Sequence, residues 1–263
     1  MAKLRSKNRA YNRLATTVSA SAYAYGWPTA GSSEPNVVAQ WLFDEASGNI
    51  VDEVASLSLA KNQSGAGASI LYAQTNSDYS NSLNPGIYMK SVTGSTDSFY
   101  AADTSLVIGT ASAVLEWVAS YGVANAMGAD DATVFNTTNN SVEHGIYVLY
   151  TNMLTTPRMN LYFKASDGTG INSFISLTAS IFNTGTHKHR LVLNRAGNAE
   201  YFVDGVSQGT ASLGTLSGKT LECSQVNLGS VLSSGVNSLE STFYEFRLTI
   251  GNATNNSGGP GGG

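Results

Sequence analysis

The sequence predicts an all-β protein that folds as an antiparallel two-sheet β-sandwich behind an extended N-terminal arm. Short strand-like segments recur between turn signals, no helical pattern separates them, and residues 186–210 carry the turns of an antiparallel meander. Apolar residues make up 42% of the 263 residues, which is enough for a core, whereas charged residues make up only 12%. The surface is therefore expected to be covered mostly by neutral polar groups.

The predicted strands follow one another along the chain in a regular series. They cover residues 37–43, 86–90, 113–121, 133–135, 145–150, 159–163 and 174–177, then the meander, then 226–229 and 243–250. The last strand alternates well, which predicts that Tyr244, Phe246 and Leu248 share the core face. Its other residues, Phe243, Glu245 and Arg247, are then expected on a wetter face.

The meander of residues 186–210 is the clearest local signal. An apolar run at 191–193 leads into a turn at 195–198, and a second run at 201–203 leads into Asp204 and Gly205. Asp-Gly between apolar residues predicts a type I′ hairpin, because both central positions need positive φ and these residues tolerate it.

Charge divides the chain into an arm, residues 1–35, a sandwich, residues 36–252, and a Gly-rich tail, residues 253–263. Residues 1–33 hold five basic side chains and no acid, whereas the remainder holds nine basic and 18 acidic side chains. Residues 1–33 therefore carry +5 and the rest −9. The segment that follows the five cations, residues 14–25, is too interrupted by Ser and Thr for a secretion signal, and no apolar run is long enough to span a membrane.

Several segments between about residues 37 and 252 resemble, in order, the laminin-G-like, concanavalin-A-like jelly-roll family. They include Trp41 to Gly48, the strand around Trp117, His187 and His189 before an apolar strand, and the hairpin from Tyr201 to Gly205. Residues 227–229 and 243–248 resemble the closing strands, with Tyr244 in place of an acid. The resemblance implies a jelly-roll fold and binding or structural work rather than catalysis.

No enzyme is predicted, because the paired carboxylates of related glucan hydrolases have no counterpart here. Asp44-Glu45, Asp52-Glu53 and Asp130-Asp131 are adjacent pairs, so on strands their side chains would point to opposite faces. No catalytic residue, no cofactor and no metal ligand is assigned. His187 and His189 would share a strand face, but they are expected to be ordinary solvent-facing residues without a third ligand. Calcium at Asp130-Asp131 stays an alternative to simple solvation.

Glycan binding is a candidate function, since exposed aromatic rings beside amide side chains can stack on and hydrogen-bond a sugar. The candidate residues lie in or next to predicted loops: Tyr72, Tyr79, Tyr100, Tyr121 and Asn136. The same tyrosines could instead serve core edges and flat protein contacts.

The arm is the candidate partner-binding segment. Its residues are the cations Lys3, Arg5, Lys7, Arg9 and Arg13, with Tyr23, Tyr25 and Trp27 as anchors. The cations could neutralise nucleic-acid phosphates, but no fold typical of nucleic-acid binding follows the arm. Pairing with copies of this chain, or with other proteins of a virus particle, is therefore favoured.

The leading hypothesis is a non-enzymatic structural virion protein of a bacteriophage, made in the host cytoplasm, as a capsid decoration, head-fibre or tail-associated subunit. The alternative is a carbohydrate-binding module acting at a host or particle surface. A third hypothesis, a secreted adhesion domain, would need an export route that the sequence does not reveal.

Overall fold

The protein is described by a computed structural model. It covers residues 37–54, 57–63, 69–74, 86–90, 98–102, 106–121, 132–137, 144–153, 156–182, 185–223, 225–229 and 241–251. The boundaries at 35 and 252 between arm, sandwich and tail stay predictions, since residues 1–36 and 252–263 lie outside these ranges. Among the described residues, no helix has the length and apolar character to cross a membrane.

Two eight-stranded sheets make up the fold, and every pair of neighbouring strands is antiparallel. The first sheet has the order β15-β14-β13-β8-β18-β5-β4, with β1 added alongside β18. Its strands are β15 (Val206–Ser212), β14 (Asn198–Val203), β13 (Thr186–Leu193), β8 (Ala113–Tyr121), β18 (Ser241–Ile250), β5 (Gly86–Lys90), β4 (Ser69–Gln74) and β1 (Val37–Trp41).

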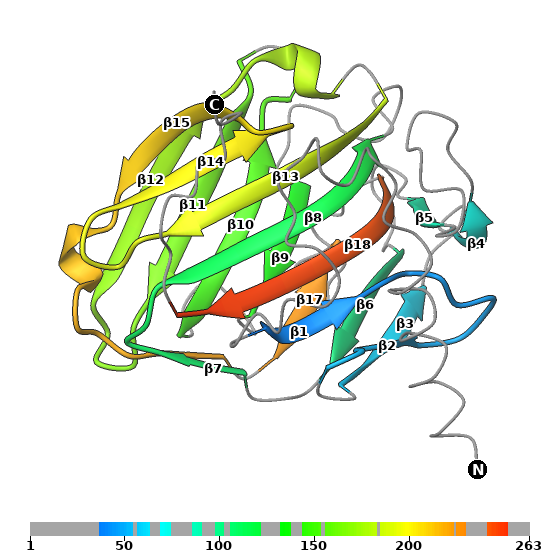
Figure 1. The fold of residues 1–263 in the computed structure, drawn as a ribbon, viewed down its shortest axis with the longest axis horizontal. Coiled ribbons are helices and arrows are strands. Elements are labelled where there is room, and N and C mark those ends of the chain that lie inside the picture. The colour runs from blue at the N-terminus through cyan, green and yellow to red at the C-terminus, as the bar shows by residue number, and fades with distance from the viewer. Residues whose placement is uncertain are drawn as a thin grey trace, which may run out of the picture.

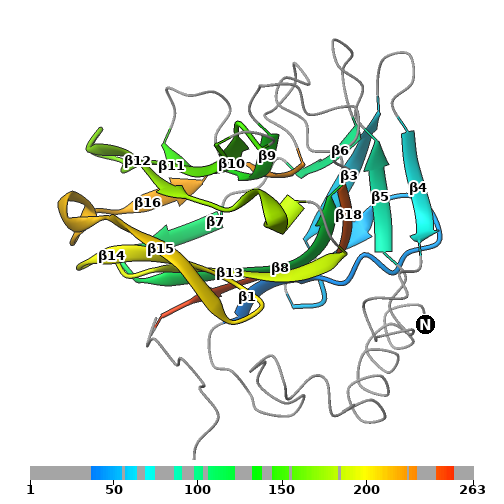
Figure 2. The ribbon, with the colours of Figure 1, turned by 90° about the horizontal axis from the view of Figure 1, so that it is seen from above.

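The second sheet has the order β12-β11-β10-β9-β17-β6-β3-β2. Its strands are β12 (Gly170–Ser176), β11 (Arg158–Lys164), β10 (Gly145–Thr151), β9 (Ala132–Asn136), β17 (Val226–Leu228), β6 (Ser98–Ala102), β3 (Ser58–Gln63) and β2 (Ile50–Val51). The short strands β7 (Leu106–Gly109) and β16 (Leu221–Cys223) pair with each other. Figure 1 shows the strand order, and Figure 2 shows β9 to β12 in one layer and β8, β13 and β14 in the other. The predicted two-sheet sandwich is thus confirmed.

The meander is also confirmed. Strand β13 pairs with β14, and β14 pairs with β15 through a two-residue connection in which Val203 lies opposite Val206. Both turn residues have positive φ, 50° at Asp204 and 80° at Gly205, as a type I′ turn requires.

The alternation predicted for β18 is wrong at its start, because a β-bulge interrupts it. Phe243 pairs with Ala119 and Glu245 pairs with Val118, so Tyr244 has no partner of its own on β8. An extra residue in one strand shifts every earlier side chain to the other face. Phe243 therefore joins the core, where its ring stacks on Phe43 at 5.5 Å.

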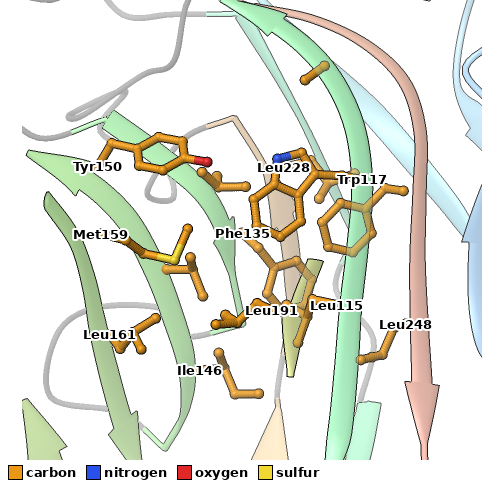
Figure 3. Packing of buried hydrophobic residues seen from close by; sticks show 14 of the residues in the cluster. Leu115, Trp117, Phe135, Ile146, Tyr150, Met159, Leu161, Leu191, Leu228 and Leu248 are labelled. Carbon is orange, nitrogen blue, oxygen red and sulfur yellow. The ribbon is translucent and has the colours of Figure 1, made fainter. Parts of the chain in front are cut away.

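The core lies between the two sheets and is centred on aromatic rings. Phe246 stacks on Phe135 at a centroid distance of 5.1 Å and on Trp117 at 6.2 Å, which joins the two layers. Figure 3 shows Trp117 and Phe135 close together, with aliphatic side chains such as Leu191 beside them. Fully burying side chains of this size stabilises the fold by about 1.5–3 kcal/mol each.

A chain of hydrogen bonds also crosses this core. The Trp117 indole N–H donates to the Tyr121 hydroxyl at 2.9 Å, which lies 3.3 Å from the Tyr150 hydroxyl. Tyr150 contacts the Tyr201 hydroxyl at 2.8 Å, and Tyr201 contacts Nδ1 of His189 at 2.6 Å. The expectation that His189 faces solvent is therefore wrong, since it lies on the core face of β13 with no exposed surface.

Candidate functional site

The structure describes four of the five residues expected to bind glycan, and it places them on four different strands. Tyr72 lies on β4 of the first sheet, where its hydroxyl donates to the Gly48 carbonyl oxygen at 2.7 Å. Tyr100 lies on β6 of the second sheet, and Tyr79 lies outside the described residues.

The exposure expected of Tyr121 and Asn136 is wrong. Tyr121 points into the core, where its hydroxyl belongs to the hydrogen-bond chain. Asn136 is fully buried, and its backbone oxygen accepts a hydrogen bond from the Asn227 amide at 3.3 Å. Both residues end strands that continue into loops, and this position made them look exposed.

The eight residues assigned to the partner-binding arm, from Lys3 to Trp27, all lie outside the described residues. Asp130 and Asp131, the calcium alternative, do so as well. Within the described ranges, no three His, Cys, Asp or Glu side chains are grouped closely enough to hold a metal ion.

A different group of side chains meets on the outer face of β10 and β11. Tyr147 and Tyr162 lie directly opposite each other across these strands, and their rings stack at 5.6 Å with an angle of 28°. Both rings are partly exposed, while Val148 and Leu161, one position along each strand, point into the core. The Tyr147 hydroxyl lies 3.3 Å from the Thr133 Oγ1, which fixes one ring of the pair.

Amide side chains border the tyrosine pair. Asn172 on β12 lies opposite Tyr162 and is exposed, and Asn160 lies two positions before Tyr162 on the same face of β11. In the described part of the chain, neither the Asn172 amide nor the Tyr162 hydroxyl has a hydrogen-bond partner. Each amide offers donors and an acceptor, so these groups can bind a polar ligand.

The same face continues to an exposed aromatic ring and a cation. Phe174 lies opposite Asn160 and is 50% exposed, and the Arg158 guanidinium lies 4.6 Å from its ring centroid. We call this surface the tyrosine face and define it by six residues: Tyr147, Arg158, Asn160, Tyr162, Asn172 and Phe174. The Asn160 amide donates to Thr151 Oγ1 at 3.5 Å, whereas the Asn172 amide has no partner in the described ranges. Flat rings beside such an amide can stack on the C–H face of a sugar and hydrogen-bond its hydroxyls.

The sequence carries a signal for this face. Residues 159–163 and 174–177 were predicted as strands, and period-two alternation turns Asn160 and Tyr162 away from a core that contains Met159 and Leu161. Asp167 and Gly168 form the turn between β11 and β12, with φ of 84° at the glycine. This hairpin brings the face together.

The carboxylates in the described ranges serve the fold. Asp52 is buried and accepts hydrogen bonds from the backbone N–H groups of Gln40 at 2.6 Å and Val54 at 3.0 Å. Glu116 pairs with Arg247, whose Nε donates to it at 3.1 Å. These contacts fix a loop and join two strands.

Comparison with known proteins shows the fold. No protein-family model matches the sequence, and no curated protein matches it either. Among solved structures, the chain is similar to the receptor-binding domain of botulinum neurotoxin D, with a TM-score of 0.56, 10% identity, and coverage of 84% of this chain and 50% of that one. It is also similar to the serotype D ligand-binding domain solved with N-acetylneuraminic acid, with a TM-score of 0.55, 11% identity, and coverage of 84% and 49%.

A third similar structure is the binding domain of botulinum neurotoxin DC in complex with rat synaptotagmin II. Its TM-score is 0.51 at 8% identity, with 81% of this chain and 48% of that chain covered. The chain thus spans about half the length of these binding domains. At such low identity the likeness defines the class of fold, a β-sandwich also found in receptor-binding domains.

Proposed function

We propose that this protein is a non-catalytic carbohydrate-binding module whose ligand lies across the tyrosine face. The observation that supports this most strongly is the stacked pair of Tyr147 and Tyr162, partly exposed and bordered by unpartnered polar groups. Exposed aromatic rings on a regular sheet are costly to leave in water and rigid enough to bind with little loss of conformational entropy.

The structural neighbours support this proposal in general terms. They are receptor- and ligand-binding domains, one in complex with N-acetylneuraminic acid and one with rat synaptotagmin II. Those ligands are theirs, and this chain covers only about half of each domain. The neighbours therefore favour a function in molecular recognition. The position of the binding site and the kind of ligand follow from the tyrosine face itself.

The proposal is tested by a glycan array followed by titration calorimetry on the best ligand. Tyr162→Ala should weaken binding at least tenfold, since an aromatic contact in a binding site contributes roughly 1.5 kcal/mol or more. Tyr72→Ala is the matched control, because it removes a half-buried tyrosine from the other sheet and should leave affinity unchanged. If no glycan on the array bound, or if only Tyr72→Ala lost binding, the proposal would be refuted.

We also propose a second function, that of a virion subunit attached through residues 1–35. The charge distribution favours it, since residues 1–33 carry +5 and the remainder −9. The two functions are compatible, because an attached subunit can present a glycan-binding face. Deleting residues 1–30 should abolish association with the particle and leave the circular-dichroism spectrum of the sandwich intact; normal incorporation of the shortened chain would contradict it.

A further inference from the structure

Arg158 is an exposed cation on the tyrosine face that no carboxylate of the described chain neutralises. Its guanidinium lies over the Phe174 ring, and among the described residues it has no hydrogen-bond or ion-pair partner. We infer that the glycan bound by this face carries a carboxylate group, which Arg158 recognises. This inference rests on the proposed function and narrows its ligand to acidic oligosaccharides.

The charge of the surrounding strands supports an acidic ligand. Strands β9 to β12 contain two basic residues, Arg158 and Lys164, and no acidic residue, although the whole chain has 18 acidic and 14 basic side chains. Asp167, in the turn that joins β11 to β12, pairs with Lys219 at 2.7 Å. The tyrosine face is therefore a positively charged surface on an acidic protein, which attracts anions.

The geometry at Arg158 suits a carboxylate. A guanidinium presents its N–H donors in a planar fork that matches the two oxygens of a carboxylate. The contact with Phe174, in which the guanidinium carbon lies 4.6 Å from the ring centroid, restrains the side chain and leaves the N–H donors of Arg158 without a hydrogen-bond partner among the described residues. Phe174 is accordingly a positioning residue, and Arg158 is the group that touches the ligand.

The spacing along β11 predicts an oligosaccharide rather than a single sugar. Arg158 and Tyr162 are four residues apart on one strand face, which corresponds to about 13 Å. That distance is longer than one pyranose ring. A sugar stacked on the tyrosine pair and a carboxylate at Arg158 would therefore belong to different residues of one chain.

The test uses acidic oligosaccharides beside neutral counterparts that share their backbone. The probes are trigalacturonate with its methyl ester, 3′-sialyllactose with lactose, and a sulfated heparin fragment, each measured against the full-length protein by biolayer interferometry. We expect an acidic probe to bind about tenfold to a hundredfold more tightly than its neutral counterpart. Arg158→Gln should abolish that preference, and Arg158→Lys should restore it only in part, since charge is kept and the fork is lost.

Each outcome separates this inference from the proposed function. Equal binding of acidic and neutral members, with Tyr162→Ala still weakening both, would overturn the acidic ligand and leave the glycan-binding module standing. Binding of the heparin fragment, but of neither trigalacturonate nor 3′-sialyllactose, would overturn the carboxylate as the group that Arg158 recognises, because the sulfates of the fragment would then be required for binding. Failure of every glycan on the array and of all these probes to bind would refute the module and this inference with it. Lys61→Gln, which removes an exposed cation near Tyr72, is the control and should leave the preference unchanged.

Discussion

Acid should destabilise this protein through His189, and the size of the effect follows from its surroundings. The imidazole is fully buried and packs against Trp117 at 5.1 Å and against Tyr201 at 6.0 Å. Its Nδ1 contacts the Tyr201 hydroxyl, while its Nε2 has no partner within the described ranges. Burial, reinforced by the nearby His187 and opposed by Asp204, lowers the pKa of His189 to about 3.

A lowered pKa makes protonation favour the unfolded chain. Above pH 6.5 the histidine is neutral in both states and costs nothing. Below 6.5 the unfolded chain takes up a proton that the folded protein refuses until about pH 3, so stability falls by about 1.4 kcal/mol per pH unit in this window. At pH 5 the loss is therefore about 2 kcal/mol relative to pH 8.

The assay is urea unfolding at pH 8 and pH 5, followed by tryptophan fluorescence. His189→Asn is the comparison variant, because its side-chain oxygen can replace Nδ1 as the partner of Tyr201 but does not titrate. It should be less stable at both pH values, since stacking is lost, yet its loss between pH 8 and pH 5 should be smaller by about 2 kcal/mol. Burial raises the pKa of Glu245 to about 6. This carboxyl titrates alike in both proteins, so its contribution cancels in the comparison.

The decisive quantity is the difference between the two proteins in their loss of stability on acidification. An identical loss in wild type and His189→Asn would show that the buried imidazole does not control the acid response, and the reasoning from its burial would fail.

Two further predictions concern the fold. Gly205→Ala should cost about 1 kcal/mol, because the β14–β15 turn holds this residue at a φ of 80°. Gly214→Ala should change stability by under about 0.5 kcal/mol, because its φ is not positive and the added Cβ would meet only Ser212 Oγ, at an ordinary 3.9 Å. Equal effects in thermal unfolding would contradict the turn assignment. Glu116→Gln should cost about 3 kcal/mol, since it removes the carboxylate with which the buried Arg247 pairs, and adding Arg247→Leu should recover part of the loss. A double variant less stable than the single would contradict the pairing.

The parts of the fold that could be predicted are those where local chemistry decides the structure. Asp204 and Gly205 determine their turn by themselves, and the strands at 86–90 and 113–121 were predicted with correct ends. Strands such as β3 and β6 were missed, since SLAKNQ and SFYAA lack a clear apolar alternation. Their strand conformation depends on pairing with each other across about 40 residues, which no local pattern reveals.

The candidate site was harder to predict because it depends on register between strands. Alternation places Tyr147 and Tyr162 each on an outer face, but only the β10–β11 pairing shows that they lie opposite each other. Proximity to loops was a misleading guide for Tyr121, which closes the end of the core instead. The core position predicted for Tyr244 was wrong for a related reason. A bulge changes which residues face inward, and the amino-acid pattern of the strand does not reveal it.

The outer faces of the two sheets differ in how their polar groups are satisfied, and this difference argues for ligand binding on only one of them. On β8 and β18, Glu116 pairs with Arg247, and Glu245 accepts a hydrogen bond from Gln40 at 2.8 Å. A ligand there would have to displace contacts that already exist. On the tyrosine face, Arg158 exchanges only water for a ligand. Glu116→Gln should therefore reduce stability without changing glycan affinity, whereas Arg158→Gln should reduce affinity for acidic glycans without changing stability.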